Sequence, residues 1–516
     1  MHDTGCMVQG VDIMYHESYI MDPDYKAMLT LEDILKATRG KVLSGERGVQ
    51  FSGVSTDSRM IKEGDIFIAL KGERFDGHDF IGDVISKGAS GAIVEREVKF
   101  TVYHSPFTII IVQDTLRALQ DIAHSVRMRY DIPVIGVTGS NGKSTTKEMI
   151  ASILSEKWRI LKNEGNINNH IGVPLTLLKI MSEHEAVVTE MAMRGVGEIR
   201  RLAEIAMPTI GIITNIGPAH LETLGGIDNV AKAKAELLEV INEEGTAILN
   251  YDDPYLRGLD LSGYKGWVVN FGFGDDTDVR AVKVRLKGLS STFSIVVKTN
   301  ILDYLLPSVM LPSTAPVIGK KRELKIEGIH LPVPGRHNIY NALAAVSVAF
   351  SLGFDQETIK KGLEHFRPLP MRSEMIDIGG RKVINDAYNS NPESLEAALQ
   401  ILINISDKGK TIAVLGDMLE LGNYKERAHR ELGSKIVNLG IDELITVGDL
   451  MKYAAEAAQR GGMRSERIHI CRNPEEAKMV LRDISKEGDT ILIKGSRAME
   501  MEKILVGIDS LQEREG

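Results

Sequence analysis

The segment VIGVTGSNGKSTT, residues 134–146, restricts the possible folds of this chain more than any other segment. An apolar run, a glycine-containing turn and a helix-forming run follow one another here, which is the context of a phosphate-binding loop in an α/β protein. The Walker pattern requires a glycine at the position of Val137, and the nearest glycine, Gly136, comes one residue too early. The segment therefore predicts a nucleotide site whose loop differs from the Walker type.

Chemistry assigns roles to individual residues of this loop. Gly139 and Gly142 permit a tight turn that directs backbone N–H groups toward a phosphate at a helix N-terminus. Lys143 would reach the outer phosphates, and Ser144 would offer its hydroxyl group to Mg²⁺. A simple Asn141–Gly142 turn is the alternative, and the preceding strand and the following Lys-Ser-Thr-Thr run favour the nucleotide site. The predicted ATP-binding residues of the loop are Thr138, Gly139, Ser140, Asn141, Gly142, Lys143, Ser144 and Thr145.

The composition predicts several hydrophobic cores and excludes a general affinity for polyanions. The 516 residues are 43% hydrophobic and 26% charged, enough for about three to four domains. The net charge of −9 argues against a nucleic-acid or membrane-surface binder, because both require a basic face. Cys6 and Cys471 form neither a metal-type pair nor a disulfide framework, which indicates a reducing, cytoplasmic location. The uncharged stretch 337–354 contains asparagines and a serine and predicts a buried helix rather than a membrane span.

Apolar segments alternate with helical segments along most of the chain, which predicts a parallel, doubly wound sheet. Residues 280–335 instead show β-like alternation with a surface excursion at 299–324, and residues 1–26 are expected to be a disordered extension. The expected strands include 65–70, 107–112, 186–192, 210–217, 246–250, 411–417, 443–449 and 489–496. The expected helices include 29–38 with Thr30 as cap, 114–130, 144–157, 338–354, and one that begins at Pro392 with Asn391 as cap.

Several polar residues follow predicted strands, where an open α/β sheet binds its ligands. Glu190 could hold a metal ion near the phosphates, and a solvated strand-end acid is the alternative. His220 follows a Gly-Pro turn after the strand at 210–217, and a lone histidine is more often structural than a ligand. Lys232 and Lys234 lie on the next predicted helix, where lysines usually form a solvated face.

Two later segments carry candidate nucleotide contacts. Asn338 and Asn341 are three residues apart at a helix start, so they share one face of the helix. Amide groups suit the edge of a purine, which mixes donors and acceptors, and helix capping is the alternative. Asp386 could accept hydrogen bonds from ribose hydroxyls, and Arg372 could contact a phosphate.

Taken together, these segments resemble the Mur ligases, ATP-dependent enzymes that form amide bonds in peptidoglycan assembly. The resemblance covers residues 27–516 and rests on the loop TGSNGKST and, in order, on Glu190, His220, Lys234, His337, Asn338, Asn341, Arg372 and Asp386. It implies an α/β protein of three domains: a smaller N-terminal UDP-sugar-binding domain (27–112), a central ATP-binding domain with a doubly wound, mostly parallel sheet (113–368), and a Rossmann-like C-terminal domain that closes on ATP and binds a dipeptide (369–516).

Further segments are similar to one branch of that family. These segments are TDSRMIKEGDIFIALKGERFDGHDFI (56–81), GNINNHIGVPLTLL (165–178), GDMLELG (416–422) with His429, and KGSRAMEME (494–502). The substrates of that branch are UDP-N-acetylmuramoyl-tripeptide and D-alanyl-D-alanine, so the resemblance implies a cytoplasmic enzyme, expected to be a monomer. The residues that it implies for the UDP-sugar are Ser58, Arg59, Lys71, Gly72, Asp76 and Asn166.

The resemblance also implies a mechanism. The tripeptide carboxylate would attack the γ-phosphate of ATP to give an acyl phosphate, and the amine of the dipeptide would then displace phosphate. Lys143 and two Mg²⁺ ions would offset the repulsion between the reacting anions. The implied metal ligands are Ser144, Glu190, His220 and Lys234. The last of these would be carbamylated by CO₂, because a charged amine would repel the metal.

Some features depart from the family pattern, and some alternatives stay open. Met371 stands where the family usually has glycine, the excursion at 299–324 is longer than expected, and residues 1–26 match no family segment. Another ligase of the Mur and folylpolyglutamate synthase group would share the loop and the metal residues. A nucleotide-driven switch ATPase is the alternative from a different class. The third amino acid of the tripeptide, lysine or diaminopimelate, does not follow from the sequence.

Overall fold

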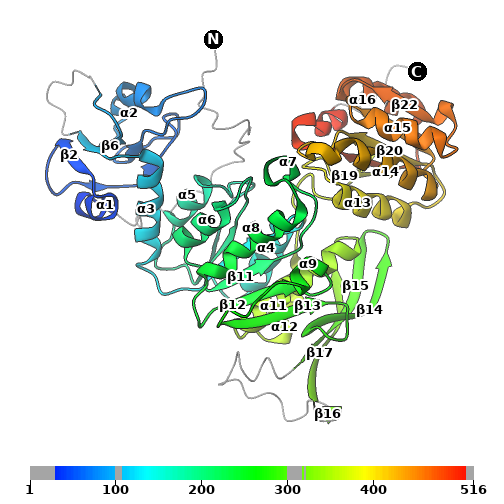
Figure 1. The fold of residues 1–516 in the computed structure, drawn as a ribbon, viewed down its shortest axis with the longest axis horizontal. Helices are drawn as coiled ribbons and strands as arrows, with labels where there is room; N and C mark the ends of the chain where they lie inside the picture. Colours follow the sequence, from blue (N-terminus) through cyan, green and yellow to red (C-terminus); the bar gives the residue numbers. More distant parts are fainter. Residues whose placement is uncertain (1–28, 99–106, 299–316, 319–320, 507–516) are drawn as a thin grey trace. The chain divides into compact units, whose positions relative to one another are not determined.

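The computed structural model describes residues 29–98, 107–298, 317–318 and 321–506 (Figure 1). The chain divides by its internal packing into two units, which are described separately: residues 1–134, 159–191 and 200–208 belong to the first, and residues 135–158, 192–199 and 209–516 to the second. The predicted extension at 1–26 and most of the excursion at 299–324 lie outside the described residues. Among the described residues, no helix has the length and apolar character needed to cross a bilayer.

The first unit contains a small sheet with helices on both faces. Its elements are β1 (Leu29–Thr30), α1 (Leu31–Thr38), β2 (Lys41–Ser44), β3 (Gln50–Phe51), β4 (Val54–Ser55), β5 (Ile66–Ile68), η1 (Gly77–Phe80), α2 (Ile81–Ser86), β6 (Gly91–Val94), β7 (Thr108–Ile111), α3 (Thr115–Arg127), β9 (Ile160–Lys162), α5 (Gly172–Leu177) and β10 (Ala186–Glu190). The sheet order is β2-β7-β6-β5-β4, with β2 antiparallel to β7 and the other neighbours parallel.

Strand β5 explains why both faces of this sheet are covered. Ile66 and Ile68 belong to one core cluster and Phe67 belongs to another, because successive strand side chains point to opposite faces. A parallel strand that is apolar on both sides requires a cover on both sides, and the helices supply it. Separately, β9 and β10 form a parallel pair.

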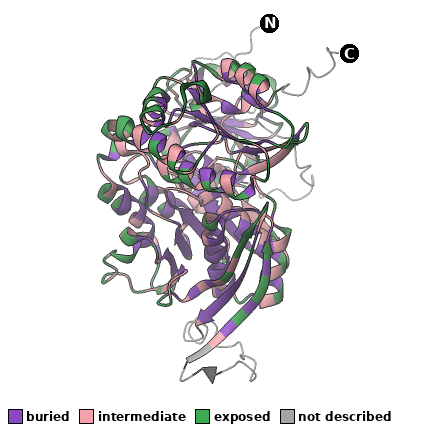
Figure 2. Cartoon of the chain, turned by 90° about the vertical axis from the view of Figure 1, so that its right-hand side faces the viewer, coloured by how far each residue is buried: buried purple, intermediate pink, exposed green. Residues whose placement is uncertain are grey.

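The second unit begins with a parallel sheet in the order β8-β11-β12-β13-β14, which continues through the antiparallel strands β15 and β17. The elements are β8 (Val134–Thr138), α4 (Lys143–Leu154), α6 (Glu198–Ala206, shared with the first unit), β11 (Ile210–Ile213), α7 (Leu221–Leu224), α8 (Ile227–Val240), β12 (Thr246–Asn250), α9 (Pro254–Arg257), β13 (Trp267–Gly272), β14 (Val279–Lys287), β15 (Ser290–Lys298), β16 (Val317–Ile318), β17 (Lys321–Leu331), α11 (Arg336–Ser351) and α12 (Gln356–His365). Strands β8, β11 and β12 are buried throughout and form an interior together with most of α11 (Figure 2).

A further sheet of the second unit has the order β18-β19-β23-β20-β21-β22. Strands β18 and β19 form an antiparallel hairpin, and the remaining neighbours are parallel, which is the expected Rossmann-like arrangement. The elements are β18 (Glu374–Ile378), β19 (Arg381–Asn385), α13 (Pro392–Ile405), β20 (Thr411–Gly416), η2 (Gly422–Tyr424), α14 (Lys425–Asn438), β21 (Glu443–Val447), α15 (Met451–Arg460), η3 (Ser465–Arg467), β22 (Ile468–Cys471), α16 (Pro474–Ile484), β23 (Thr490–Lys494), η4 (Arg497–Met499) and η5 (Met501–Leu505).

The structure confirms the predicted α/β class and both predicted helix caps. Thr30 caps α1 through a capping box with Asp33, which satisfies backbone N–H groups that a helix start leaves unpaired. Asn391 caps α13 and accepts from the backbone N–H of Ser394, with Pro392 as the first helical residue. The strands and helices expected from apolar patterning are present, and the hairpin β18–β19 is an addition.

Candidate functional site

The predicted phosphate loop connects β8 to α4 and is shaped by two glycines. Gly139 has φ 146° and Gly142 has φ 80°, values in the left-handed region that glycine adopts without a steric penalty. Lys143 is the first residue of α4, and its Nζ donates to the carbonyl oxygens of Gly139 (2.9 Å) and Ser140 (3.2 Å). The lysine therefore folds back over the loop at a helix N-terminus, which is a favourable place for a phosphate.

The segment after β11 is joined to this loop by hydrogen bonds. In the parallel pair, Thr138 of β8 lies opposite Ile213 of β11, so both strands end at the same edge of the sheet. The backbone N–H of Asn141 donates to Asn215 Oδ1 (2.8 Å), and Thr214 Oγ1 donates to the carbonyl of Asn141 (2.6 Å). The TNIGPAH segment that leads to His220 is therefore fixed against the phosphate loop.

Lys234 lies on α8 and is almost completely buried. Burial, together with the positive charge of Lys143, lowers the pKa of the Lys234 amine well below its usual value, because a charged group loses hydration inside the protein. Lys232 on the same helix is exposed. Sequence patterning alone does not distinguish these two lysines, but the structure buries Lys234 and exposes Lys232.

Asn338 and Asn341 share a face of α11, as their spacing predicts. Asn341 Nδ2 donates to Asn338 Oδ1 (3.2 Å), and Thr146 Oγ1 in α4 donates to Asn341 Oδ1 (3.2 Å). A Cβ atom on Gly142 would lie 2.3 Å from Asn341 Oδ1, so the start of α11 packs directly against the loop. Burial lowers the pKa of the neighbouring His337 to about 4, which keeps its ring neutral near pH 7.

Asp386 and Arg372 are held by protein groups. Asp386 Oδ2 pairs with Lys494 Nζ at 2.5 Å, and Asp386 Oδ1 accepts from the backbone N–H of Ser373 at 2.8 Å. The Arg372 guanidinium lies 3.8 Å from the centre of the Tyr388 ring, a cation–π contact. Sequence reasoning did not single out Lys494, although its place at the end of the apolar strand in DTILIKGS was a usable signal.

The start of α13 contacts the phosphate loop, which the sequence did not indicate. Asn391 Nδ2 donates to Asn141 Oδ1 (2.7 Å), and Asn141 Nδ2 donates to Glu393 Oε2 (3.1 Å). The Glu393 side chain is exposed, and nearby protein atoms partly desolvate its carboxyl group. This shielding, reinforced by Asp253, raises the pKa of Glu393 to about 7.

His220 also has a partner that sequence reasoning missed. Its Nδ1 lies 2.7 Å from Glu420 Oε2, and Glu420 belongs to the GDMLELG segment. A cavity of about 1050 Å³ lies beside this pair, lined by Pro218, Leu221 and Glu222 from one segment and by Leu419, Tyr424 and Lys425 from the other.

Glu190, the remaining predicted metal ligand, belongs to the first unit and ends β10 there. It is buried, and its Oε1 accepts from Asn168 Nδ2 at 2.7 Å. Its backbone N–H donates to Asn163 Oδ1 at 2.8 Å. Within the first unit, then, Asn168 holds the carboxylate and Asn163 holds the backbone of Glu190. The burial of this carboxylate argues against the solvated strand-end alternative.

The predicted UDP-sugar residues also belong to the first unit. Lys71 and Asp76 form an isolated β-bridge, and the carbonyl of Ser58 accepts from Lys87 Nζ at 2.7 Å. Burial opposes ionisation of Asp76, but hydrogen bonds from His78 and Arg96 lower its pKa to about 2. Arg59 pairs with Asp57, Gly72 donates its N–H to the Phe75 carbonyl, and the Asn166 carbonyl accepts from the Asn168 N–H.

The donor set is consistent with a cation that is shared with a nucleotide. Among the described residues, no group of three or more His, Cys, Asp or Glu side chains could hold a metal ion by itself. Mg²⁺ is usually bound through one or two protein ligands together with substrate phosphates rather than by an all-protein cage. The buried Ser144, which follows Lys143 in the first turn of α4, fits such a shared site.

Comparison with known proteins gives a consistent result. Three family models match: the Mur ligase family catalytic domain at residues 50–127, the Mur ligase middle domain at 137–349, and the Mur ligase glutamate ligase domain at 371–497. The UDP-N-acetylmuramoyl-tripeptide–D-alanyl-D-alanine ligases of Bacillus subtilis and Escherichia coli are similar, at 34% and 32% identity, each over 92% of this chain and 97% of its own length.

Solved structures agree with these sequence matches. MurF from Acinetobacter baumannii has a TM-score of 0.81 at 31% identity and covers 94% of this chain and 99% of its own. MurF ligase from Thermotoga maritima, solved in complex with ADP, has a TM-score of 0.72 at 28% identity and covers 89% of this chain and 97% of its own. This chain belongs to the Mur ligase family.

Proposed function

We propose that this chain is an ATP-dependent ligase that joins D-alanyl-D-alanine to UDP-N-acetylmuramoyl-tripeptide. The products are UDP-N-acetylmuramoyl-pentapeptide, ADP and phosphate, and the reaction belongs to peptidoglycan precursor synthesis in the cytoplasm. The observation that carries the proposal is similarity over 92% of the chain to a relative whose name states both substrates. The phosphate loop with Lys143 folded over it supports the use of ATP.

The proposed reaction has two steps. A carboxylate oxygen of the tripeptide bonds to the γ-phosphorus while the bond to ADP breaks. The dipeptide amine then attacks the acyl carbon, phosphate leaves with its oxygen, and the amine proton is released. Lys143 offsets the repulsion between the first pair of anions. The cavity beside His220 has room for the dipeptide, and Lys425 on its wall offers a cation for the dipeptide carboxylate.

The remaining predicted residues keep their proposed roles. Two Mg²⁺ ions, when bound, would neutralise charge on the phosphates. Their proposed ligands are Ser144, Glu190, His220 and Lys234. Asn338 and Asn341 would contact the adenine base, and His337 would contact ATP. Asp386 would accept hydrogen bonds from the ribose hydroxyls, and Arg372 would contact a phosphate. The UDP-sugar residues and the domain limits 27–112, 113–368 and 369–516 also stay proposals.

Phosphate release tests the proposed function. Release from ATP should require the UDP-sugar tripeptide and should increase when D-alanyl-D-alanine is added. Parallel assays with lysine-containing and diaminopimelate-containing tripeptides would identify the third residue of the substrate. Release that is indifferent to both substrates would instead favour a switch ATPase.

Carbamylation of Lys234 is part of this proposal. The neutral amine that burial favours is the form that attacks CO₂. Its nitrogen bonds to the carbon, one proton leaves, and an anionic carbamate suited to a cation results. Full-length protein in ¹³C-bicarbonate should give a carbamate signal by NMR that Lys234→Ala removes.

The exposed neighbour provides the matched control for this experiment. Lys232→Ala should retain the signal, because Lys232 lies on the solvent side of α8. Short carboxylates should restore part of the activity of Lys234→Ala. A fully active Lys234→Ala variant would end this proposal.

A further inference from the structure

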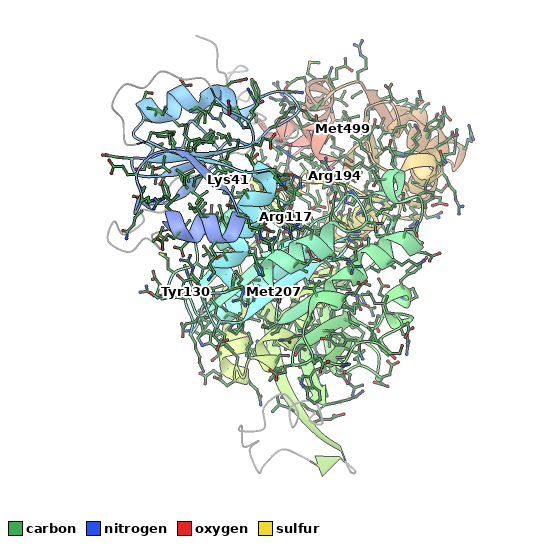
Figure 3. The ribbon with its side chains drawn as sticks, turned by 60° about the vertical axis from the view of Figure 1, so that its left-hand side comes forward. Lys41, Arg117, Tyr130, Arg194, Met207 and Met499 are labelled. Carbon is green, nitrogen blue, oxygen red and sulfur yellow. The ribbon has the colours of Figure 1, made fainter. Side chains whose placement is uncertain are left out.

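His220 is held by a carboxylate from the GDMLELG segment. The Nδ1 to Oε2 distance of 2.7 Å is that of a hydrogen bond, and the two side chains are 27% and 51% exposed. An ion pair with this exposure adds little stability, so its importance is geometric. Arg194, labelled in Figure 3, lies near this pair: its carbonyl accepts from Thr223 Oγ1 in α7, and its charge acts on Glu420.

Both residues of the pair have a strained backbone. His220 has φ 55° and Glu420 has φ 61°, in the left-handed region that is unfavourable for a residue with a Cβ atom. Such strain persists where the surrounding structure imposes it, and it clusters at functional sites. Here the strained backbone places His220 at the start of α7, with Glu420 facing the His220 ring.

The segment that carries Glu420 is fixed in place. Leu421 is buried, and a Cβ atom on Gly422 would lie 3.2 Å from the Cα atom of Glu222 in α7. The backbones therefore approach each other closely. The backbone next to Glu420 is thus packed against α7, and the Glu420 side chain reaches His220 from there.

We propose that Glu420 is a positioning residue for His220. By accepting the Nδ1–H, Glu420 selects the tautomer whose Nε2 lone pair is available to a divalent cation. Histidines that bind metals usually donate their other N–H group to a carboxylate, a carbonyl or water. The inference rests on the proposed ligand role of His220, and it makes cation binding depend on docking of the 418–425 segment against α7.

Manganese binding tests the inference without relying on turnover. The unbound Mn²⁺ signal in electron paramagnetic resonance would be titrated against full-length protein with a non-hydrolysable ATP analogue. Glu420→Ala should weaken the His220-dependent site by about 10–100-fold. Glu420→Gln should weaken it less, because its amide oxygen still accepts the Nδ1–H, whereas a direct metal ligand would lose affinity equally in both variants. Glu426→Ala, which removes an exposed carboxylate paired with Arg430, is the matched control and should bind as wild type.

A double variant separates positioning from an independent effect. If Glu420 acts through His220, then adding Glu420→Ala to His220→Ala changes Mn²⁺ affinity no further. An additional loss of Mn²⁺ affinity in the double variant would overturn the inference. Wild-type Mn²⁺ affinity in Glu420→Ala would also overturn it if His220→Ala binds Mn²⁺ more weakly. Wild-type affinity in His220→Ala would remove the proposed ligand role itself and the inference with it.

Discussion

His337 is a predicted nucleotide contact, and burial lowers the pKa of its ring. Its surface is partly accessible, but its ring is shielded from water. The shielding lowers its pKa to about 4. The negative charge of Asp386 opposes this shift, and the positive charge of Lys494 supports it. The unfolded chain therefore binds more protons than the folded chain between about pH 6.5 and pH 4. The stability that a neutral His337 contributes is present above this range and is lost as the pH falls through it.

We therefore predict that the burial of His337 makes the free energy of unfolding decrease as the pH falls. Between pH 7 and pH 5, the free energy of unfolding of wild type should fall by about 1–2 kcal/mol more than that of His337→Gln. Denaturant titrations at both pH values would measure it. His330→Gln, which also removes an exposed histidine, serves as the control variant. A parallel response of wild type and His337→Gln would contradict the prediction.

The sequence indicated site residues where local pattern and chemistry coincide. Lys143 follows a glycine loop, and Asn338 and Asn341 share a helix face, so each could be found from its neighbours in the chain. Glu393 and Glu420 could not, because their partners Asn141 and His220 are distant in sequence. Only the tertiary fold brings such pairs together.

Among the structural elements, the segment before β18 contains Met371, the residue that departs from the family pattern. Met371, at a position where glycine is usual in the family, has φ 58°. Its backbone N–H donates to Glu374 Oε2 at 2.9 Å, and its carbonyl accepts from the N–H of Tyr388. These bonds hold a conformation that glycine adopts without penalty.

We predict that Met371→Gly is more stable than Met371→Ala by about 1 kcal/mol. Both variants remove the methionine side chain beyond its Cβ atom, but only alanine keeps the left-handed strain. The greater freedom of glycine in the unfolded chain offsets part of the gain. Thermal unfolding of the two variants would measure the difference. An alanine variant as stable as the glycine variant would show that the strain is absent.

Element prediction succeeded where patterning and capping agree. The strands β8, β11 and β12 are apolar runs that lie buried in a parallel sheet, and Asn391 with Pro392 marks the start of α13. Strand β18 and its antiparallel pairing with β19 were not predicted, because the half-buried residues of β18 mix polar and apolar types. On its other side, β19 pairs in parallel with β23.

At the scale of the whole molecule, the resemblance to the family supplied the three-domain α/β architecture, and the comparisons confirm it. Periodicity alone gave a parallel sheet but neither the strand order nor the docking of the GDMLELG segment against α7. Those features depend on contacts between packed elements, which no local pattern encodes. We therefore claim that these parts act together as one ligase.

Formation of the joined product tests that claim most directly. Full-length protein would be incubated with ATP, Mg²⁺, UDP-N-acetylmuramoyl-tripeptide and D-alanyl-D-alanine, and the nucleotides would be followed by mass spectrometry. We predict a UDP-sugar peptide heavier by the dipeptide less one water, formed in equal amount to ADP and only with both substrates present. ADP formation without this product, at a rate that neither substrate changes, would contradict it.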